Sequence, residues 1–537
     1  MKQLNKSVLL ILGAALLAGL TLLAYSPAFH GGFIFDDNVL LTQNPLIRAP
    51  DGWRRFWLSR EAADYWPVTS SALWLEWRLW GLNAAGYHCV NVGLHLAEGL
   101  ILWTVLWRLR VPGAFLGALV FTLHPVNAES VVWISQLKNL LSMLFYLLAI
   151  LWYVPAEGMA AEGEAGFSSP RYWLSLGAFM FALLSKGSVV FLPLVLMGLV
   201  AWHRRPTRRD WSGLLPFFLV AAALAAVEAR SSTITGFAVQ SGSGFFRPAA
   251  RAGIMVWFYL GKALYPANLM FAYPPWAHLR LDLEGWLPFL AAVGLTLVLA
   301  ICARRGQRFA RGALLAWVYF CAALLPVLGF AEVGFMRYTP VSNHYEHLAI
   351  IGVAAGVAAA WASALQPGWT LRTVGLLGGA VGVVILLGFL TWQQARIYRD
   401  AETLYTDTLL RNPASWMAEN NLGAVWLGQG KLPQAQDRFE AALRLNPDYA
   451  EADNNLGLTL VRMGRLPEAM DRYRAALRLE PGFYAAENNL GAALARAGRL
   501  AEAVPHFERA LVLAPDYPEA RSNLDRALKL SSGGGLK

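Results

Sequence analysis

Long apolar stretches, separated by short polar segments, fill the chain from its N-terminus to about residue 392. Because roughly twenty apolar residues cross a bilayer as a helix, this pattern predicts an all-α bundle of membrane-spanning helices. We expect about 11 spans, over residues 8–25, 86–107, 112–123, 131–153, 172–184, 188–202, 214–227, 286–301, 313–330, 349–364 and 374–392.

Basic residues in the loops orient this bundle. Lys2 and Lys6 precede the first span, which we interpret as retained because it is long for a signal peptide. Arginines cluster in the loops 204–209 and 304–311, and such loops face the cytoplasm. If segment 254–264 crossed the membrane, the second cluster would fall outside. We therefore interpret it as interfacial or re-entrant, which puts the C-terminus outside.

Two outer loops have distinctive compositions. The loop 27–85 is rich in tryptophan and arginine, as in 53–57 and 74–80. Mixed segments of this kind are typical of helices lying in the headgroup region. The polar loop 231–244 is expected on the same side.

An internal repeat begins after residue 392. Asn-Asn-Leu-Gly recurs at 420–423, 454–457 and 488–491, and prolines recur with the same period of 34 at Pro413, Pro447, Pro481 and Pro515. This is the period of tetratricopeptide repeats, which stack helix pairs into an α-solenoid that binds peptides or partners. We expect a membrane domain over 1–392, the repeat domain over 393–530 and a disordered tail over 531–537.

Composition supports the membrane assignment. Of 537 residues, 56% are apolar and only 15% are charged. The net charge of +10 comes largely from arginines in loops that the topology places inside, so nucleic-acid binding is not indicated. Three cysteines without a CxxC pair indicate neither a zinc cluster nor a disulfide framework.

Polar residues are predicted to converge at the outer ends of the spans, where they are costly and mark function. The set comprises Asp36, Asp37, His124, Glu129, Lys138, Lys186, His344 and Tyr345.

Simpler interpretations remain open for each member of this set. Asp36 and Asp37, which follow Phe33-Ile34-Phe35, either face a cavity at the bilayer edge or form an Asx turn. The ammonium groups of the two lysines alternatively extend to the lipid headgroups. His88, Asn91 and His95 share one helical face and alternatively only hold helices together.

This residue set suits sugar transfer from a lipid phosphate. Cations hold the phosphate and stabilise it as it departs, and a carboxylate removes the proton of an acceptor hydroxyl. A metal site built from His124, Glu129, His344 and His347 lacks HExxH spacing. We therefore predict no metal site and no cofactor, with assistance by a divalent ion left open.

Several motifs occur together in a recognisable order: 33–37, Tyr65-Trp66-Pro67, 86–95, 124–129, 133–141 and Leu184-Ser185-Lys186. The series resembles the transmembrane-and-tetratricopeptide-repeat O-mannosyltransferases and their bacterial relatives, within the C-type glycosyltransferases that use polyprenyl-phosphate sugars.

The resemblance implies roles for individual residues. Asp36 would be the base, with Asp37 close behind, and the donor would contact Lys138, Lys186, Arg78, His124, Glu129, His344 and Tyr345. The sequence departs from the family pattern at Trp66, where an Arg is usual, at Asn139, where an Asp often stands, and at Gly187, where a Glu is usual.

We therefore expect an inverting membrane glycosyltransferase that moves mannose or another hexose from a polyprenyl phosphate to a protein Ser or Thr hydroxyl. Its repeats would present the acceptor on the periplasmic side of a bacterial inner membrane. A non-catalytic scaffold for envelope complexes is the main alternative. A transporter of lipid-linked sugars is a weaker one, because the two halves of the membrane region show no internal symmetry.

Overall fold

A computed structural model describes residues 6–59, 61–62, 64–155, 167–232, 246–276, 283–330, 334–366 and 370–533. Every regular element among these residues is a helix, which confirms the predicted all-α class. The predicted loop 231–244 and the tail 531–537 lie almost entirely outside the described residues.

The chain forms two compact units. The first comprises Met1–Phe271 with Pro275–Asp400, and the second comprises Ala272–Pro274 with Ala401–Lys537. The sequence placed the change of domain after residue 392, whereas the last helix of the first unit continues to Ile397.

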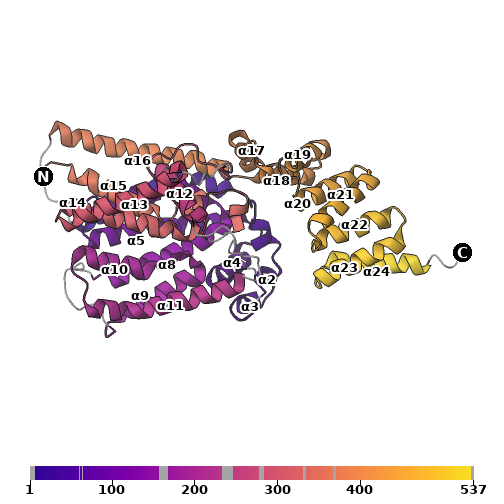
Figure 1. Ribbon diagram of the computed structural model, residues 1–537, viewed down its shortest axis with the longest axis horizontal. Helices are drawn as coiled ribbons and strands as arrows, with labels where there is room; N and C mark the ends of the chain where they lie inside the picture. The colour runs from indigo at the N-terminus through magenta and orange to yellow at the C-terminus, as the bar shows by residue number, and fades with distance from the viewer. Residues whose placement is uncertain are drawn as a thin grey trace. The chain divides into compact units, whose positions relative to one another are not determined.

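The first unit is built from long helices that run alongside one another (Figure 1). Its α-helices are α1 (Lys6–Ala24), α2 (Pro45–Arg48), α3 (Gly52–Leu58), α4 (Pro67–Trp80), α5 (Ala84–Arg108), α6 (Ala114–Thr122), α7 (Ala128–Val132), α8 (Leu137–Tyr153), α9 (Pro170–Ser185), α10 (Leu192–His203), α11 (Arg208–Ser232), α12 (Phe246–Leu264), α13 (Leu283–Arg304), α14 (Arg308–Leu324), α15 (Ile350–Ser363) and α16 (Leu371–Ile397).

Short 3-10 and π turns join these helices. They are η1 (Ser26–His30), η2 (Asn38–Thr42), η3 (Pro125–Asn127), η4 (Ile134–Gln136), η5 (Gly187–Val189), η6 (Leu325–Val327), η7 (Gly334–Arg337) and η8 (Asn343–Tyr345).

The apolar helices of this unit define a polytopic membrane protein. Among the described residues, seven helices are long and apolar enough to cross a bilayer, or eight if the bent pair 114–122 and 125–132 forms one span. Two shorter apolar helices cover 187–203 and 350–363. Each of the eleven predicted spans coincides with a helix, but the number that cross stays a prediction. Helix α12 is not among the candidates, and its interfacial position stays a prediction too.

The loop 27–85 is folded onto the helix bundle. Its residues Leu41, Ile47, Phe56 and Leu73 are buried in one cluster with three residues of the bundle: Tyr87 of α5, Ile134 of η4 and Leu137 of α8. Burial of such side chains is worth about 1.5–3 kcal/mol each. The loop therefore fixes the ends of α5 and α8, where the candidate site lies.

The second unit is a stack of antiparallel helix pairs (Figure 1). Its helices are α17 (Ala401–Arg411), α18 (Trp416–Gly428), α19 (Leu432–Leu445), α20 (Ala450–Arg462), α21 (Leu466–Leu479), α22 (Tyr484–Arg496), α23 (Leu500–Leu513) and α24 (Pro518–Gly533).

Repeat glycines admit an aromatic ring within each pair. A Cβ on Gly457 of α20 would lie 2.7 Å from the Tyr473 ring of α21, and Gly423 and Gly491 face Phe439 and Phe507 in the same way. Each aromatic ring therefore packs against the glycine of its own helix pair. The three rings also belong to one hydrophobic cluster that continues from repeat to repeat.

Candidate functional site

Asp37 is a buried carboxylate whose two oxygens are both occupied. Its Oδ2 accepts the Ile34 N–H at 2.9 Å, and its Oδ1 accepts the Ser135 N–H at 2.8 Å as well as the Ser135 hydroxyl. Burial and the neighbouring Asp36 raise the pKa of Asp37 to about 7. By accepting from η4, Asp37 holds the turn from which α8 starts, and with it the position of Lys138.

Asp36 is in a different situation. Its Oδ1 is buried and has no hydrogen-bond partner among the described residues. Burial raises the pKa of Asp36, while Lys138, Ser135 and Trp133 act in the opposite direction. A carboxylate with a free oxygen beside a lysine can accept a proton, so the structure distinguishes the two adjacent carboxylates.

The backbone before Asp36 is strained. Phe35 has φ +47°, a conformation that is an outlier for a bulky residue. Its ring makes edge contacts with Trp133, Phe271 and Phe335, at centroid distances of 5.5–5.7 Å. These contacts hold the strained conformation, and strain of this kind clusters at functional sites. The apolar residues before Asp36 are thus explained by packing rather than by contact with lipid.

Two lysines interact with each other in this region, and one of them, Lys138, also interacts with Asp36. Lys138, in the first turn of α8, lies over the Trp66 ring at 5.2 Å from its centroid. The Lys186 Nζ donates to Asn139 Oδ1 at 2.5 Å. Burial, followed by repulsion from Lys138, lowers the pKa of Lys186 to about 7. Two neighbouring cations of which one is destabilised by burial suit an anionic ligand.

Local contacts fix Lys186 at the end of α9. Its backbone is extended, with φ −166° and ψ 129°, and its carbonyl accepts the Ser142 hydroxyl of α8 at 3.3 Å. The preceding Ser185 carbonyl accepts the Thr69 hydroxyl of α4 at 2.9 Å. Three helices therefore position this lysine.

Glu129 connects three segments of the bundle. Its Oε1 accepts from the Ser342 hydroxyl at 2.7 Å and lies 2.5 Å from His344 Nδ1. Its Oε2 accepts from Asn343 at 3.0 Å and from the Tyr398 hydroxyl at 3.2 Å. These contacts occupy the carboxylate, so Glu129 holds His344 in place rather than facing a ligand.

Two predicted donor contacts lie in other surroundings. Arg78 stacks on Trp74 and donates to the carbonyls of Ile47 and Ala49 at 2.8 and 2.6 Å, at the end of α2. The His124 Nε2 lies 3.1 Å from the Ala263 carbonyl of α12. The structure does not bring either side chain into contact with the lysines.

Lys186, His344 and Tyr345 line one small cavity together with Asn139 and His347. Its volume of about 30 Å³ holds about two water molecules. A sugar is larger, so this cavity is a border of the candidate site.

Two acidic residues near the lysines were missed from the sequence. Lys138 and Lys186 both oppose the rise in the pKa of Asp64 that burial causes. Glu228 of α11 accepts from Trp66 Nε1 at 3.1 Å, and its carboxylate occupies the space that a side chain at Gly187 would need. Asp64 directly precedes the Tyr65-Trp66-Pro67 motif, which could have indicated it. Nothing local marks Glu228, because its partners lie in other helices.

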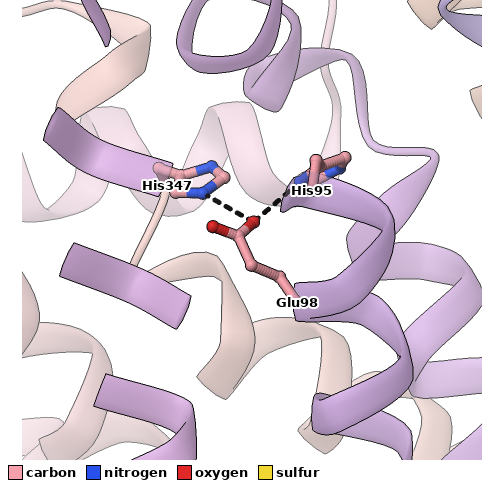
Figure 2. Close-up of side chains that lie close together, drawn as sticks. All are labelled: His95, Glu98 and His347. Atoms are coloured by element: carbon pink, nitrogen blue, oxygen red, sulfur yellow. Dashed lines mark hydrogen bonds and ion pairs between the residues drawn. The ribbon is translucent and has the colours of Figure 1, made fainter. Parts of the chain in front are cut away.

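One group of described residues could hold a metal ion. His95, Glu98 and His347 are buried and place one ligand atom each within 4.8 Å of one another (Figure 2). The metal-ligand set weighed from the sequence was a different one, and His347 is the only residue common to the two sets.

Comparison with known proteins confirms the predicted repeats. The geometry so far defines a polytopic helical membrane protein with a helical-repeat unit. A family model described as a tetratricopeptide repeat matches residues 391–435, 427–471 and 454–518. Among solved structures, the first TPR of Spaghetti (RPAP3) bound to an HSP90 peptide is 23% identical, with a TM-score of 0.22, and covers 22% of this chain and 93% of that one.

Curated relatives match about a quarter to a third of the chain. Protein O-mannosyl-transferase F38B6.6 of Caenorhabditis elegans is 29% identical over 154 residues, which are 26% of this chain and 22% of that protein. Protein O-mannosyl-transferase TMTC4 of Homo sapiens is 28% identical over 207 residues, which are 34% of this chain and 28% of that protein. The chain is therefore related, at the level of the family, to protein O-mannosyl-transferases, although the match spans only about a quarter of their length.

Proposed function

We propose that this chain is a membrane glycosyltransferase that transfers a sugar to a Ser or Thr hydroxyl of a protein. The names of its relatives support this activity. The observation that carries the proposal is the free, buried oxygen of Asp36 beside Lys138. The donor is a polyprenyl-phosphate sugar, mannose or another hexose.

Asp36 acts as the general base in a single displacement. The acceptor oxygen attacks the anomeric carbon while its proton passes to Asp36, and the bond from that carbon to the phosphate oxygen breaks. The polyprenyl phosphate leaves on the opposite face, so the anomeric centre is inverted. One base suffices, because a phosphate leaving group needs little help from an acid.

Lys138 and Lys186 hold the phosphate of the donor. The phosphodiester of the donor carries one negative charge and gains a second as the polyprenyl phosphate leaves. This charge would relieve the repulsion between the two lysines and restore the charge of Lys186, which burial disfavours. His344 and Tyr345 border the same region. Arg78, His124 and Glu129 contribute through the segments that they hold, because their polar atoms already contact other parts of the chain.

The repeats supply the acceptor side of the reaction. Tetratricopeptide repeats present extended surfaces for peptides or partner proteins. In a bacterial inner membrane, the active site and the repeats would both face the periplasm, where substrate proteins emerge.

Transfer of label from a short-chain polyprenyl-phosphate mannose to periplasmic protein tests the proposal. Membranes would contain the wild type or the variant Lys138→Ala with Lys186→Ala. We expect labelled protein with the wild type and a loss of about 100-fold or more in the double variant, because removing charges from a leaving phosphate costs that much. Equal label in both samples would remove the lysines from the mechanism.

The scaffold alternative predicts a different outcome. A membrane anchor that only displays its repeats would transfer no label to protein, whether the donor is polyprenyl-phosphate mannose or another lipid-linked sugar. Its cellular function would then depend on the repeats and not on Lys138 or Lys186.

A further inference from the structure

A buried cluster inside the bundle consists of two histidines and a glutamate that have no role in the proposed transfer reaction. His95 and Glu98 lie one turn apart on α5, and His347 comes from the segment between η8 and α15 (Figure 2). The three side chains are at most 3% exposed. The Glu98 Oε2 lies 2.9 Å from His95 Nδ1 and 3.3 Å from His347 Nε2.

Hydrogen bonds on the far side of each ring determine which nitrogen carries its proton. The His95 Nε2 lies 3.1 Å from the Thr122 carbonyl, which can only accept, so Nε2 must donate. The His347 Nδ1 lies 2.9 Å from Asn127 Oδ1. This amide orientation is fixed, because the Asn127 nitrogen donates to the Phe121 carbonyl at 2.7 Å. His347 Nδ1 therefore also donates.

Three electron pairs then point at one another. In the neutral rings, His95 Nδ1 and His347 Nε2 are acceptors, and both face a carboxylate oxygen, which is an acceptor as well. A single proton on Glu98 could satisfy only one of the two rings. In keeping with this, His347 Nε2 and Glu98 Oε1 have no hydrogen-bond partner among the described residues. Unpaired polar atoms at this depth are expensive.

We propose that His95, Glu98 and His347 bind a divalent zinc ion. Two imidazoles and one carboxylate are a common zinc ligand set, with metal–ligand distances of about 2.0–2.2 Å. Tetrahedral ligands at that distance lie about 3.3 Å apart, close to the separations of 2.9 and 3.3 Å found here. The carbonyl and amide acceptors behind the rings are the partners that orient histidine ligands in metal sites.

The ion would join parts of the bundle that flank the candidate site. It would tie α5 to the segment that carries His344, and His347 itself lines the small cavity next to Lys186. With three protein ligands, the fourth tetrahedral position would be taken by water. The role that we propose for the ion is to hold these segments together, separately from the transfer step.

Zinc content of the purified full chain tests the proposal. Protein in detergent would be loaded with Zn²⁺, dialysed into zinc-free buffer and analysed by mass spectrometry for metal per chain. The variants are Glu98→Gln and His347→Gln. The matched control is His88→Gln, which changes another buried histidine two turns earlier on α5.

We expect about one zinc ion per chain in the wild type and in His88→Gln, and loss of that zinc from both ligand variants. Wild-type protein that retains no zinc would overturn the proposal. The three side chains would then be joined by hydrogen bonds alone. Zinc that persists in both ligand variants would also overturn it.

If the variants fail to fold, as judged by helicity and gel filtration, the visible spectrum of cobalt-loaded wild type decides. A tetrahedral nitrogen–oxygen spectrum would support the site, and an octahedral aqueous spectrum would exclude it.

Discussion

Asp36 and Asp37 are adjacent in sequence, yet their environments assign them different tasks. Asp37 accepts from two backbone N–H groups and a hydroxyl, and so holds the start of α8. Asp36 keeps an oxygen free. The sequence could indicate the pair but could not rank its members by their contacts, because Ser135, which makes the difference, lies 98 residues away.

Replacing Asp37 by Ala is expected to lower stability. The change would leave the buried N–H groups of Ile34 and Ser135 without acceptors, and each unpaired group costs about 1–3 kcal/mol. The midpoint of thermal unfolding in detergent should fall clearly. Asp51→Ala is the control, because its side chain is 66% exposed. Equal midpoints for the two variants would show that Asp37 does not hold this structure.

Lys186 predicts the pH dependence of donor binding. Its pKa near 7 means that the free protein carries this charge below pH 7 and loses it above. A bound phosphate raises that pKa, so binding takes up a proton above pH 7. The Kd for donor should therefore rise by about tenfold per pH unit there.

The variant Lys186→Arg keeps its charge throughout this range. Titrations of both proteins with a non-transferable polyprenyl phosphate at several pH values check the prediction. If the wild type and Lys186→Arg show the same slope, the proton uptake belongs to another group.

At the scale of elements, the apolar pattern predicted where the helices lie, and the repeat period predicted the helix pairs. Both signals are local, since they depend on spacing within a helix. The fold of 27–85 was less predictable, because its residues pack onto α5 and α8. Glu228 was missed for the same reason: it fills the space beside Gly187 from α11.

Tight packing in the repeats makes Gly457 sensitive to substitution. In Gly457→Ala, the new methyl group would press on the buried Tyr473 ring, and overpacking costs about 1–3 kcal/mol. Hydrogen exchange of the amides of α20 and α21 in the full chain should accelerate.

Gly482→Ala is the matched control, because open space surrounds a Cβ at that position. Unchanged exchange in Gly457→Ala would mean that the helix pair adapts without loss of stability.

For the whole molecule, the charge rule predicts which parts share a side of the membrane. In a background without Cys89, Cys302 and Cys321, an impermeant maleimide applied to intact spheroplasts should label Asp51→Cys and Glu519→Cys. Arg205→Cys, in a basic loop, should react only after permeabilisation.

The alternative topology is one in which segment 254–264 crosses the membrane. Labelling of Asp51→Cys but not of Glu519→Cys would mean that α12 crosses the membrane and that the repeats face the cytoplasm. The repeats could then not present an acceptor to the outer site.

The central claim is that Asp36 is the base of a sugar transfer, and one rate measures it most directly. Purified protein in lipid nanodiscs would receive labelled polyprenyl-phosphate mannose and a Ser/Thr-rich protein acceptor. We predict that Asp36→Asn binds the donor but transfers about 100-fold more slowly or worse, while Asp51→Asn matches the wild type. Transfer by Asp36→Asn at the wild-type rate would contradict the account.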